Sequence, residues 1–212
     1  MAIGPVRFSE IVGAISPLLS VTAFYRRRLP HYHCVGAPIF ITWRLHGSLP
    51  GNRKFSATLP SGQAFVAMNR ILDSESTGPL FLRMPEIAHM VVDAIEYREW
   101  QQHYRLHSYT VMPNHVHLLI TPLVDIPKLM QSLKRFTARQ GNRILSRGGQ
   151  PFWQDESYDR LVRDDREFQR IAYYIEMNPV RAGLAASPEE FLWSSAGRTT
   201  SPPRVANPPH GL

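Results

Sequence analysis

Two histidines two residues apart, His115 and His117, are the residues whose type and spacing point most directly to chemistry. In a β-strand, side chains at positions i and i+2 lie on one face, so both imidazoles point the same way. Two convergent imidazoles are a common start of a divalent metal site. The alternative is a histidine pair on a solvated strand face. The apolar residues 118–120 that follow favour a central strand, and therefore the metal site.

Tyr174 and Asn178 form a second candidate pair, four residues apart in a segment with helical periodicity. They lie one turn apart on the flank of an apolar face centred on Phe168. The phenol could act as a nucleophile if a metal polarises its target, and the amide oxygen could be a hard metal ligand. The alternative is an aromatic helix that packs on a sheet. Arg170, which lies just beyond Tyr174 around the surface of the same helix, is a candidate to assist the phenol in its attack.

A third candidate surface is a basic stripe on the helix expected over residues 127–146. No acidic residue occurs between residues 126 and 154, whereas a solvated helix face usually mixes charges of both signs. Positions four apart lie close together on a helix, and one-signed stripes favour contact with phosphates. The alternative is a merely solvated face. The residues expected to contact nucleic acid are Lys134, Arg135, Arg139 and Arg143.

The elements that must position these residues are three strands and four helices. The turn Pro113-Asn114 predicts that the second and third strands form a hairpin. Proline disfavours helix at the residue before it, so the last helix is expected to end at Asn178-Pro179. Residues 151–163 are interpreted as an aromatic connector. The predicted strands are 39–46, 104–112 and 115–121, and the predicted helices are 62–74, 85–102, 127–146 and 166–177. This order predicts an α+β fold with one small antiparallel sheet and helices packed on it.

Composition narrows the class of protein. The chain has 212 residues, 43% of them hydrophobic, which excludes a wholly disordered protein. Its 24 Lys and Arg outnumber its 17 Asp and Glu, and the net charge of +7 favours polyanionic partners, nucleic acid first. The single cysteine, Cys34, excludes an internal disulfide and a CxxC zinc site. Because no run of eighteen apolar residues occurs, no membrane span is expected.

The chain is expected to contain one folded domain with two extensions. Residues 1–30 are interpreted as an N-terminal arm, 31–197 as the domain and 198–212 as a disordered proline-rich tail. The composition fits a cytoplasmic protein.

Three segments, in this order, resemble motifs of the single-tyrosine transposases. MPNHVHLLI (112–120) is similar to their HUH motif, two histidines around a hydrophobic residue. YYIEMNPVRAGL (173–184) resembles their catalytic-tyrosine helix, and FLWSSAG (191–197) resembles their usual ending. The spacing, and FWQDESYDRLVRD (152–164), are most similar to the REP-associated tyrosine transposases. The resemblance covers roughly residues 31–197.

The resemblance implies a ferredoxin-like α+β sandwich with the histidine pair on a central strand. It implies cleavage and rejoining of single-stranded DNA beside a small hairpin, through a 5′-phosphotyrosine intermediate. Tyr174 would be the nucleophile, and His115, His117 and Asn178 would hold Mg²⁺ or Mn²⁺. Whether the protein acts as a monomer or a homodimer stays open.

Two other functions remain compatible with the sequence. One is a catalytically silent protein that holds DNA or RNA hairpins. The other is a metal-dependent hydrolase of a small substrate, which would activate water and would not need Tyr174.

Overall fold

The computed structural model describes residues 23–26, 30–49, 69, 71–74 and 78–198. Most of the expected arm and nearly all of the expected tail lie outside these ranges. Of the helix expected over residues 62–74, Asn69 and residues 71–74 are described; Asn69 and residues 71–73 are helical, and Ser74 lies in a turn.

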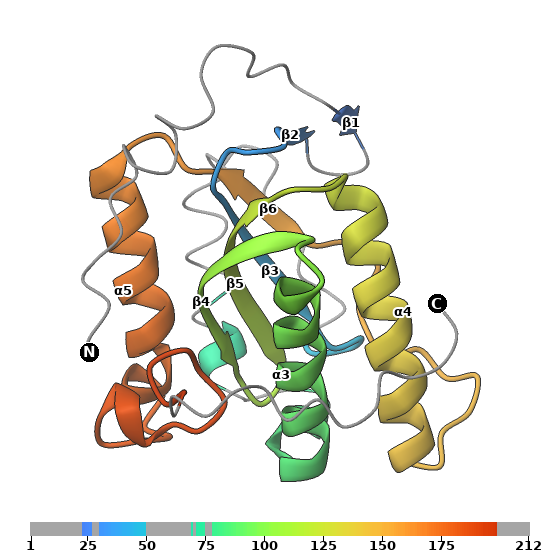
Figure 1. Cartoon of the computed structure of the whole chain (residues 1–212). Helices are drawn as coiled ribbons and strands as arrows, with labels where there is room; N and C mark the ends of the chain where they lie inside the picture. The colour runs from blue at the N-terminus through green and yellow to red at the C-terminus, as the bar shows by residue number, and fades with distance from the viewer. Residues whose placement is uncertain (1–22, 27–29, 50–68, 70, 75–77, 199–212) are drawn as a thin grey trace.

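A four-stranded antiparallel sheet forms the centre of the fold (Figure 1). Its spatial order is β4-β5-β3-β6, so the strand that carries both histidines lies inside the sheet. Every residue of that strand is buried, which explains its apolar sequence. The strands are β3 (Ile39–Arg44), β4 (Tyr104–Val111), β5 (His115–Pro122) and β6 (Tyr158–Leu161). The predicted hairpin of β4 and β5 is confirmed.

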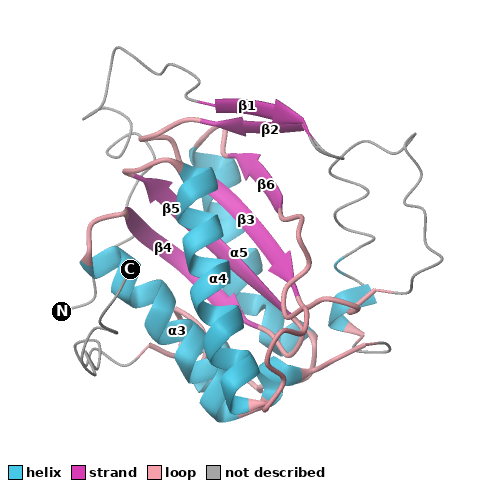
Figure 2. Ribbon diagram, turned by 90° about the vertical axis from the view of Figure 1, so that its right-hand side faces the viewer, coloured by secondary structure: helices cyan, strands magenta, loops and turns pink. Residues whose placement is uncertain are grey.

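Three helices cover the two faces of the sheet unequally. The helices α3 (Pro85–Trp100) and α4 (Ile126–Ile144) lie on one face, and α5 (Asp165–Arg181) lies on the other (Figures 1 and 2). Aspartate side chains cap two of them: Asp125 accepts from the backbone of Lys128 at the start of α4, and Asp164 accepts from Glu167 at the start of α5. None of the helices in the described ranges combines the length and apolar character needed to cross a bilayer. The predicted α+β fold is confirmed.

Alternation along β3 and β5 divides the apolar side chains between two cores. Odd positions of β3 and even positions of β5 enter the large core beneath α3 and α4. The opposite positions face α5, where the apolar cluster is small and is joined by His115, His117 and Thr42. That second cluster consists of Phe40, Leu119, Val162, Phe168 and Ile175.

The structure differs from the sequence predictions at three places. The expected connector 151–163 contains β6, because Tyr158–Leu161 pairs with Ile39–Thr42 of β3. The expected arm contains β1 (Ala23–Arg26), which pairs with β2 (Pro30–His33).

The third difference is at the end of α5, which continues through Pro179 to Arg181. A proline in the last turn removes only one backbone donor. The amides of Ala182 and Leu184 still bond to the carbonyls of Asn178 and Pro179, at 3.0 and 2.8 Å, and they hold the helix end together.

Candidate active site

The two histidines of β5 lie side by side on the face of the sheet that α5 covers. Both are fully buried, and their Nε2 atoms are 3.0 Å apart. Since the side chains of one strand alternate, Val116 between them points into the large core instead. The predicted convergence of the two imidazoles is thus present, at a separation that places both nitrogens around one point.

The other ring nitrogens are fixed by neighbouring side chains. His115 Nδ1 lies 2.6 Å from Asn114 Oδ1, and His117 Nδ1 lies 2.7 Å from Thr42 Oγ1. An amide oxygen only accepts, so His115 Nδ1 carries the proton and its Nε2 presents a lone pair. Thr42 faces His117 across the β3–β5 ladder, and its hydroxyl can accept the same kind of bond. Such partners orient imidazoles for metal binding.

Burial keeps both histidines neutral. It lowers the pKa of His115 to about 3 and lowers the pKa of His117 well below its usual value, with a further contribution from His115. A metal ligand needs the neutral imidazole, so both residues are ready to bind a cation at neutral pH.

Tyr174 brings a hydroxyl from α5 to the histidine pair. Its ring centroid lies 5.4 Å from that of His117, and its hydroxyl accepts a hydrogen bond of 2.6 Å from Asn69 Nδ2. Burial raises the pKa of Tyr174 and the charge of Asp73 adds to the rise, while the Asn69 bond and the charge of Arg181 oppose it. The phenol is therefore protonated in the free protein.

Asn178 lies one turn after Tyr174, as predicted. Its Nδ2 is 3.5 Å from the tyrosine hydroxyl, and its buried Oδ1 has no hydrogen-bond partner among the described residues. A buried carbonyl oxygen without a partner costs free energy that a bound cation would recover. Among the described residues, no group of three His, Cys, Asp or Glu is arranged to hold a metal ion. Two imidazoles and this amide oxygen are a donor set that suits Mg²⁺ or Mn²⁺.

Sequence reasoning missed several residues that line the site, among them Asn69, Asp73 and Asn114. Asn69 and Asp73 stand four residues apart, a helical spacing that the sequence does show, and Asp73 Oδ1 lies 3.6 Å from His115 Nε2. Asn114 was interpreted only as a turn residue, but it holds His115 and also donates to the carbonyl of Leu72 at 3.0 Å.

Among the described residues, the cation beside Tyr174 is Arg181 and not Arg170. Arg181 Cζ lies 5.7 Å from the centroid of the Tyr174 ring, whereas Arg170 pairs with Glu167 at 3.7 Å. Tyr158, the other tyrosine near the site, packs edge-on against Phe40.

The basic stripe lies apart from the histidine site. Its helix, α4, packs on the opposite face of the sheet, and Arg135, Arg139 and Arg143 are exposed. Lys134 Nζ instead donates to the carbonyls of Gln154 and Asp155, at 2.6 and 2.9 Å, and so holds the segment before β6 against α4. A groove of about 600 Å³ opens between α4 and this segment, with Arg135 in its lining.

An α+β sheet with a histidine pair on an inner strand and a tyrosine on the facing helix is the arrangement that the resemblance to the single-tyrosine transposases implies. Residues 83–178 match the family of IS200-like transposases. No curated protein matches the chain. The family predicted from the motifs is confirmed over these residues, and the match supports a transposase-type, DNA-binding function.

A solved structure supports the fold. The chain is similar to a REP-associated tyrosine transposase bound to a REP hairpin, with 18% identity, 84% of each chain covered and a TM-score of 0.51. At 18% identity, this similarity supports the arrangement of strands and helices, that is, the fold alone.

Proposed function

We propose that this protein cleaves and rejoins single-stranded DNA beside a hairpin, with Tyr174 as the nucleophile. The observation that carries the proposal is the gathering of two neutral imidazoles, a tyrosine hydroxyl and an unpartnered amide oxygen in one buried site. The bound REP hairpin of the similar structure supports hairpin DNA as the substrate.

His115, His117 and Asn178 would hold the divalent ion, Mg²⁺ or Mn²⁺, through their Nε2 and Oδ1 atoms. When bound, that ion supplies charge withdrawal from a non-bridging oxygen of the scissile phosphate. The Asp73 carboxylate, 3.6 Å from His115 Nε2, adds the negative charge that an otherwise neutral donor set lacks. Asn114 and Thr42 keep the two imidazoles aimed at the same point.

The proposed reaction begins when the Tyr174 hydroxyl gives its proton to solvent. The phenolic oxygen forms a bond to phosphorus, the bond from phosphorus to the 3′ oxygen breaks, and that leaving oxygen takes a proton from solvent. The products are a 5′-phosphotyrosine and a free 3′-OH, and the reverse attack by a 3′-OH rejoins the strand. Arg181 stabilises the phenolate charge, which the raised pKa of Tyr174 makes costly.

The exposed arginines of α4 would contact the DNA backbone on the other side of the sheet. Since α4 lies near β3 and β6, a bound strand would pass around the β6 edge to reach Tyr174. The proposal places the protein in the cytoplasm, with the DNA on which it acts.

The test is covalent capture of labelled single-stranded DNA taken from the flanks of the gene, with Mn²⁺, on a denaturing gel. Tyr174→Phe should abolish the adduct and leave hairpin binding within about twofold, because only the nucleophilic oxygen is lost. The matched control is Tyr173→Phe, whose hydroxyl belongs to a 58% exposed side chain, and it should form the adduct normally.

Other outcomes would favour the other functions. Hairpin binding on a native gel without an adduct in the wild type would favour a silent hairpin-binding protein. Hydrolysis of a small phosphodiester that survives Tyr174→Phe would favour a metal-dependent hydrolase.

A further inference from the structure

The segment 193–198, which follows α5, runs along the outer edge of β4. The amide of Val111 donates to the carbonyl of Trp193 at 2.8 Å, and the amide of Ser195 donates to the carbonyl of Tyr109 at 2.9 Å. Thr110 and Ser194 form an antiparallel bridge between these two bonds. Thr110 also pairs with His117 on its other side, so the segment lies one strand away from the histidine pair.

Ser195 connects this edge to α5. Its hydroxyl accepts from the amide of Tyr109 at 3.2 Å, and its one proton has two acceptors within reach, Glu176 Oε1 at 3.3 Å and the Tyr109 carbonyl at 3.4 Å. Glu176 belongs to α5 and comes two residues after Tyr174. At 100° per residue the two side chains leave the helix about 200° apart. A bond at Glu176 therefore resists rotation of α5 about its axis, the motion that would swing Tyr174 away from His117.

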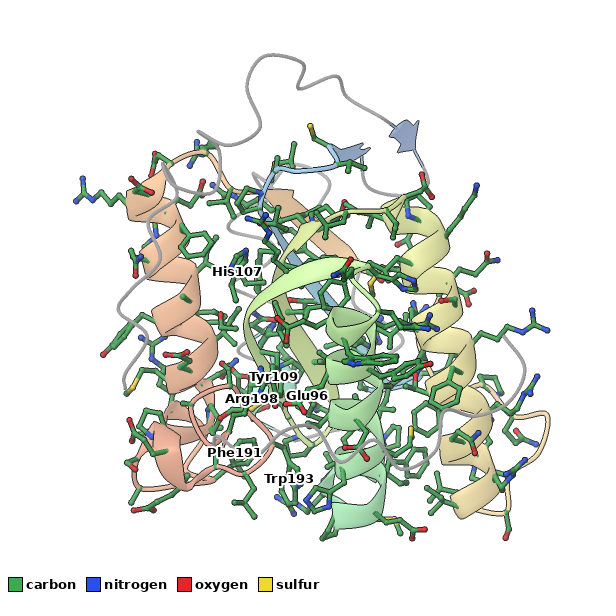
Figure 3. The ribbon with its side chains drawn as sticks, in the orientation of Figure 1. Glu96, His107, Tyr109, Phe191, Trp193 and Arg198 are labelled. Carbon is green, nitrogen blue, oxygen red and sulfur yellow. The ribbon has the colours of Figure 1, made fainter. Side chains whose placement is uncertain are left out.

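Arg198 connects the same segment to the opposite face of the sheet. It pairs with Glu96 and Glu99 of α3, at 3.2 and 3.5 Å. Glu96 also accepts from the Tyr109 hydroxyl at 3.0 Å, and Figure 3 shows Glu96, Tyr109 and Arg198 close together. One short segment thus spans the β4 edge and contacts a helix on each face.

A tight turn gives this segment its shape. Ser194 Oγ donates to the carbonyl of Phe191 at 3.0 Å and accepts from the amide of Gly197 at 3.2 Å. A Cβ at position 197 would lie 2.1 Å from the Phe191 carbonyl oxygen, so only glycine fits. The turn places Ser195 within hydrogen-bonding distance of Glu176.

We propose that Ser195 and Glu176 are positioning residues: their hydrogen bond fixes the rotation of α5 and so holds the Tyr174 hydroxyl over the histidine pair. This inference rests on the proposed function only for its effect on rate. The placement of Tyr174 itself is measurable without DNA.

The first experiment is ¹⁹F NMR of the full chain labelled with 3-fluorotyrosine, with the Tyr174 resonance assigned by Tyr174→Phe. Ser195→Ala should shift or broaden that resonance, and Ser195→Thr should restore it, because threonine keeps the donating hydroxyl. The matched control is Ser132→Ala, which removes a hydroxyl bonded only within α4 and should leave the resonance in place. An unchanged Tyr174 resonance in folded Ser195→Ala would overturn the proposal.

The second experiment is the rate of adduct formation. A misplaced nucleophile should slow the Ser195→Ala protein roughly 10- to 100-fold, with unchanged KM for the DNA and unchanged Mn²⁺ affinity. Glu176→Gln, which changes no volume, should show a smaller loss in the same direction and serves if Ser195→Ala folds poorly. Equal loss of rate, Mn²⁺ affinity and DNA binding would indicate general destabilisation and contradict a positioning role.

The two proposals fail in different ways. If the wild type forms no adduct with any flanking DNA, the proposed function fails, and the ¹⁹F shift still decides the placement of Tyr174. If the adduct forms equally fast in both proteins, only the positioning role fails.

Discussion

The two faces of the central sheet differ in the kind of side chain that they bury. Beneath α3 and α4 the strands bury a large, almost entirely apolar core. Beneath α5 they bury five apolar side chains together with two histidines and a threonine, and the partly buried Tyr174 packs beside them. Polar groups in such a place contribute little to stability unless they are paired, and Asn178 Oδ1, which has no partner among the described residues, lowers stability.

This difference indicates that stability comes mainly from the α3/α4 face, whereas the α5 face holds the residues of the proposed active site. Adjacent residues of β5 belong to different faces, so single substitutions one position apart can test each role.

Leu118→Ala should lower the free energy of unfolding by about 3 kcal/mol, because it opens a cavity in the large core. The folded fraction should keep its Mn²⁺ affinity, since the α5 face is unchanged. The measurement is urea unfolding together with calorimetric Mn²⁺ titration. The control is Leu123→Ala, a 40% exposed leucine just after β5, which should change stability by about 0.5 kcal/mol or less. Equal losses in the two variants would contradict the proposed division.

His117→Ala should show the opposite pattern, with Mn²⁺ affinity falling roughly 100-fold or more. One of two imidazole ligands is lost, while the large core is untouched. Calorimetry or Mn²⁺ EPR measures the affinity, and the exposed His89→Ala is the matched control. Retained affinity in His117→Ala would exclude this residue as a ligand.

The pH dependence of stability should also reside on the α5 face, in part at His107. Its ring contacts Phe168 of α5, and its Nε2 lies 2.8 Å from Thr121 Oγ1. Burial, with help from Arg105, lowers the pKa of His107 to about 4 in the folded protein, against about 6.5 in the unfolded chain. The unfolded chain therefore binds the proton first, so stability is lost as the pH falls from about 6.5 towards 4.

His107→Gln should remove this contribution, at most about 2 kcal/mol between pH 7 and pH 5. The measurement is the difference between the free energies of unfolding at the two pH values, in the variant and in the wild type. His115 and His117 titrate in both proteins, so the comparison isolates His107. The same pH dependence in both would show that His107 is not held neutral.

Much of this difference between the two faces of the sheet could be predicted from the sequence. The period of a strand or helix, and the spacing of residues along it, are properties of a single segment. The i, i+2 rule placed His115 and His117 on one face, and the i, i+4 rule placed Tyr174 and Asn178 together. The central position of β5 followed from its apolar residues. Each of these inferences needs only one element.

What the sequence did not predict depends on contacts between distant segments. The bond from Asn69 to Tyr174 spans 105 residues, and the bond from Thr42 to His117 spans 75. The periodicity of a single strand or helix does not indicate such distant hydrogen-bond partners. The same holds for β6, whose four residues become a strand only beside β3, and for Arg181, which reaches Tyr174 because α5 continues through Pro179.

The weakest effect is expected for the arginine stripe of α4, which lies on the face of the sheet opposite the histidine pair. Arg135→Gln with Arg139→Gln should weaken hairpin binding about three- to tenfold and lower the slope of log K against log[salt] by about one to two, because each lost phosphate contact releases fewer counterions. Fluorescence anisotropy at several salt concentrations measures both. The control with equal charge change is Arg83→Gln with Arg105→Gln, two exposed arginines outside α4.

The outcome decides the path of the DNA. A lower salt slope in the Arg135/Arg139 variant with an unchanged adduct rate at saturating DNA would mean that α4 binds the hairpin and the α5 face only cuts. An unchanged slope in that variant, with a lower slope in the Arg83/Arg105 control, would place the hairpin at the other end of the sheet. In that case the phosphate backbone would approach Tyr174 from the β4 side, where the segment 193–198 already covers the edge, and that segment would have to contact DNA directly.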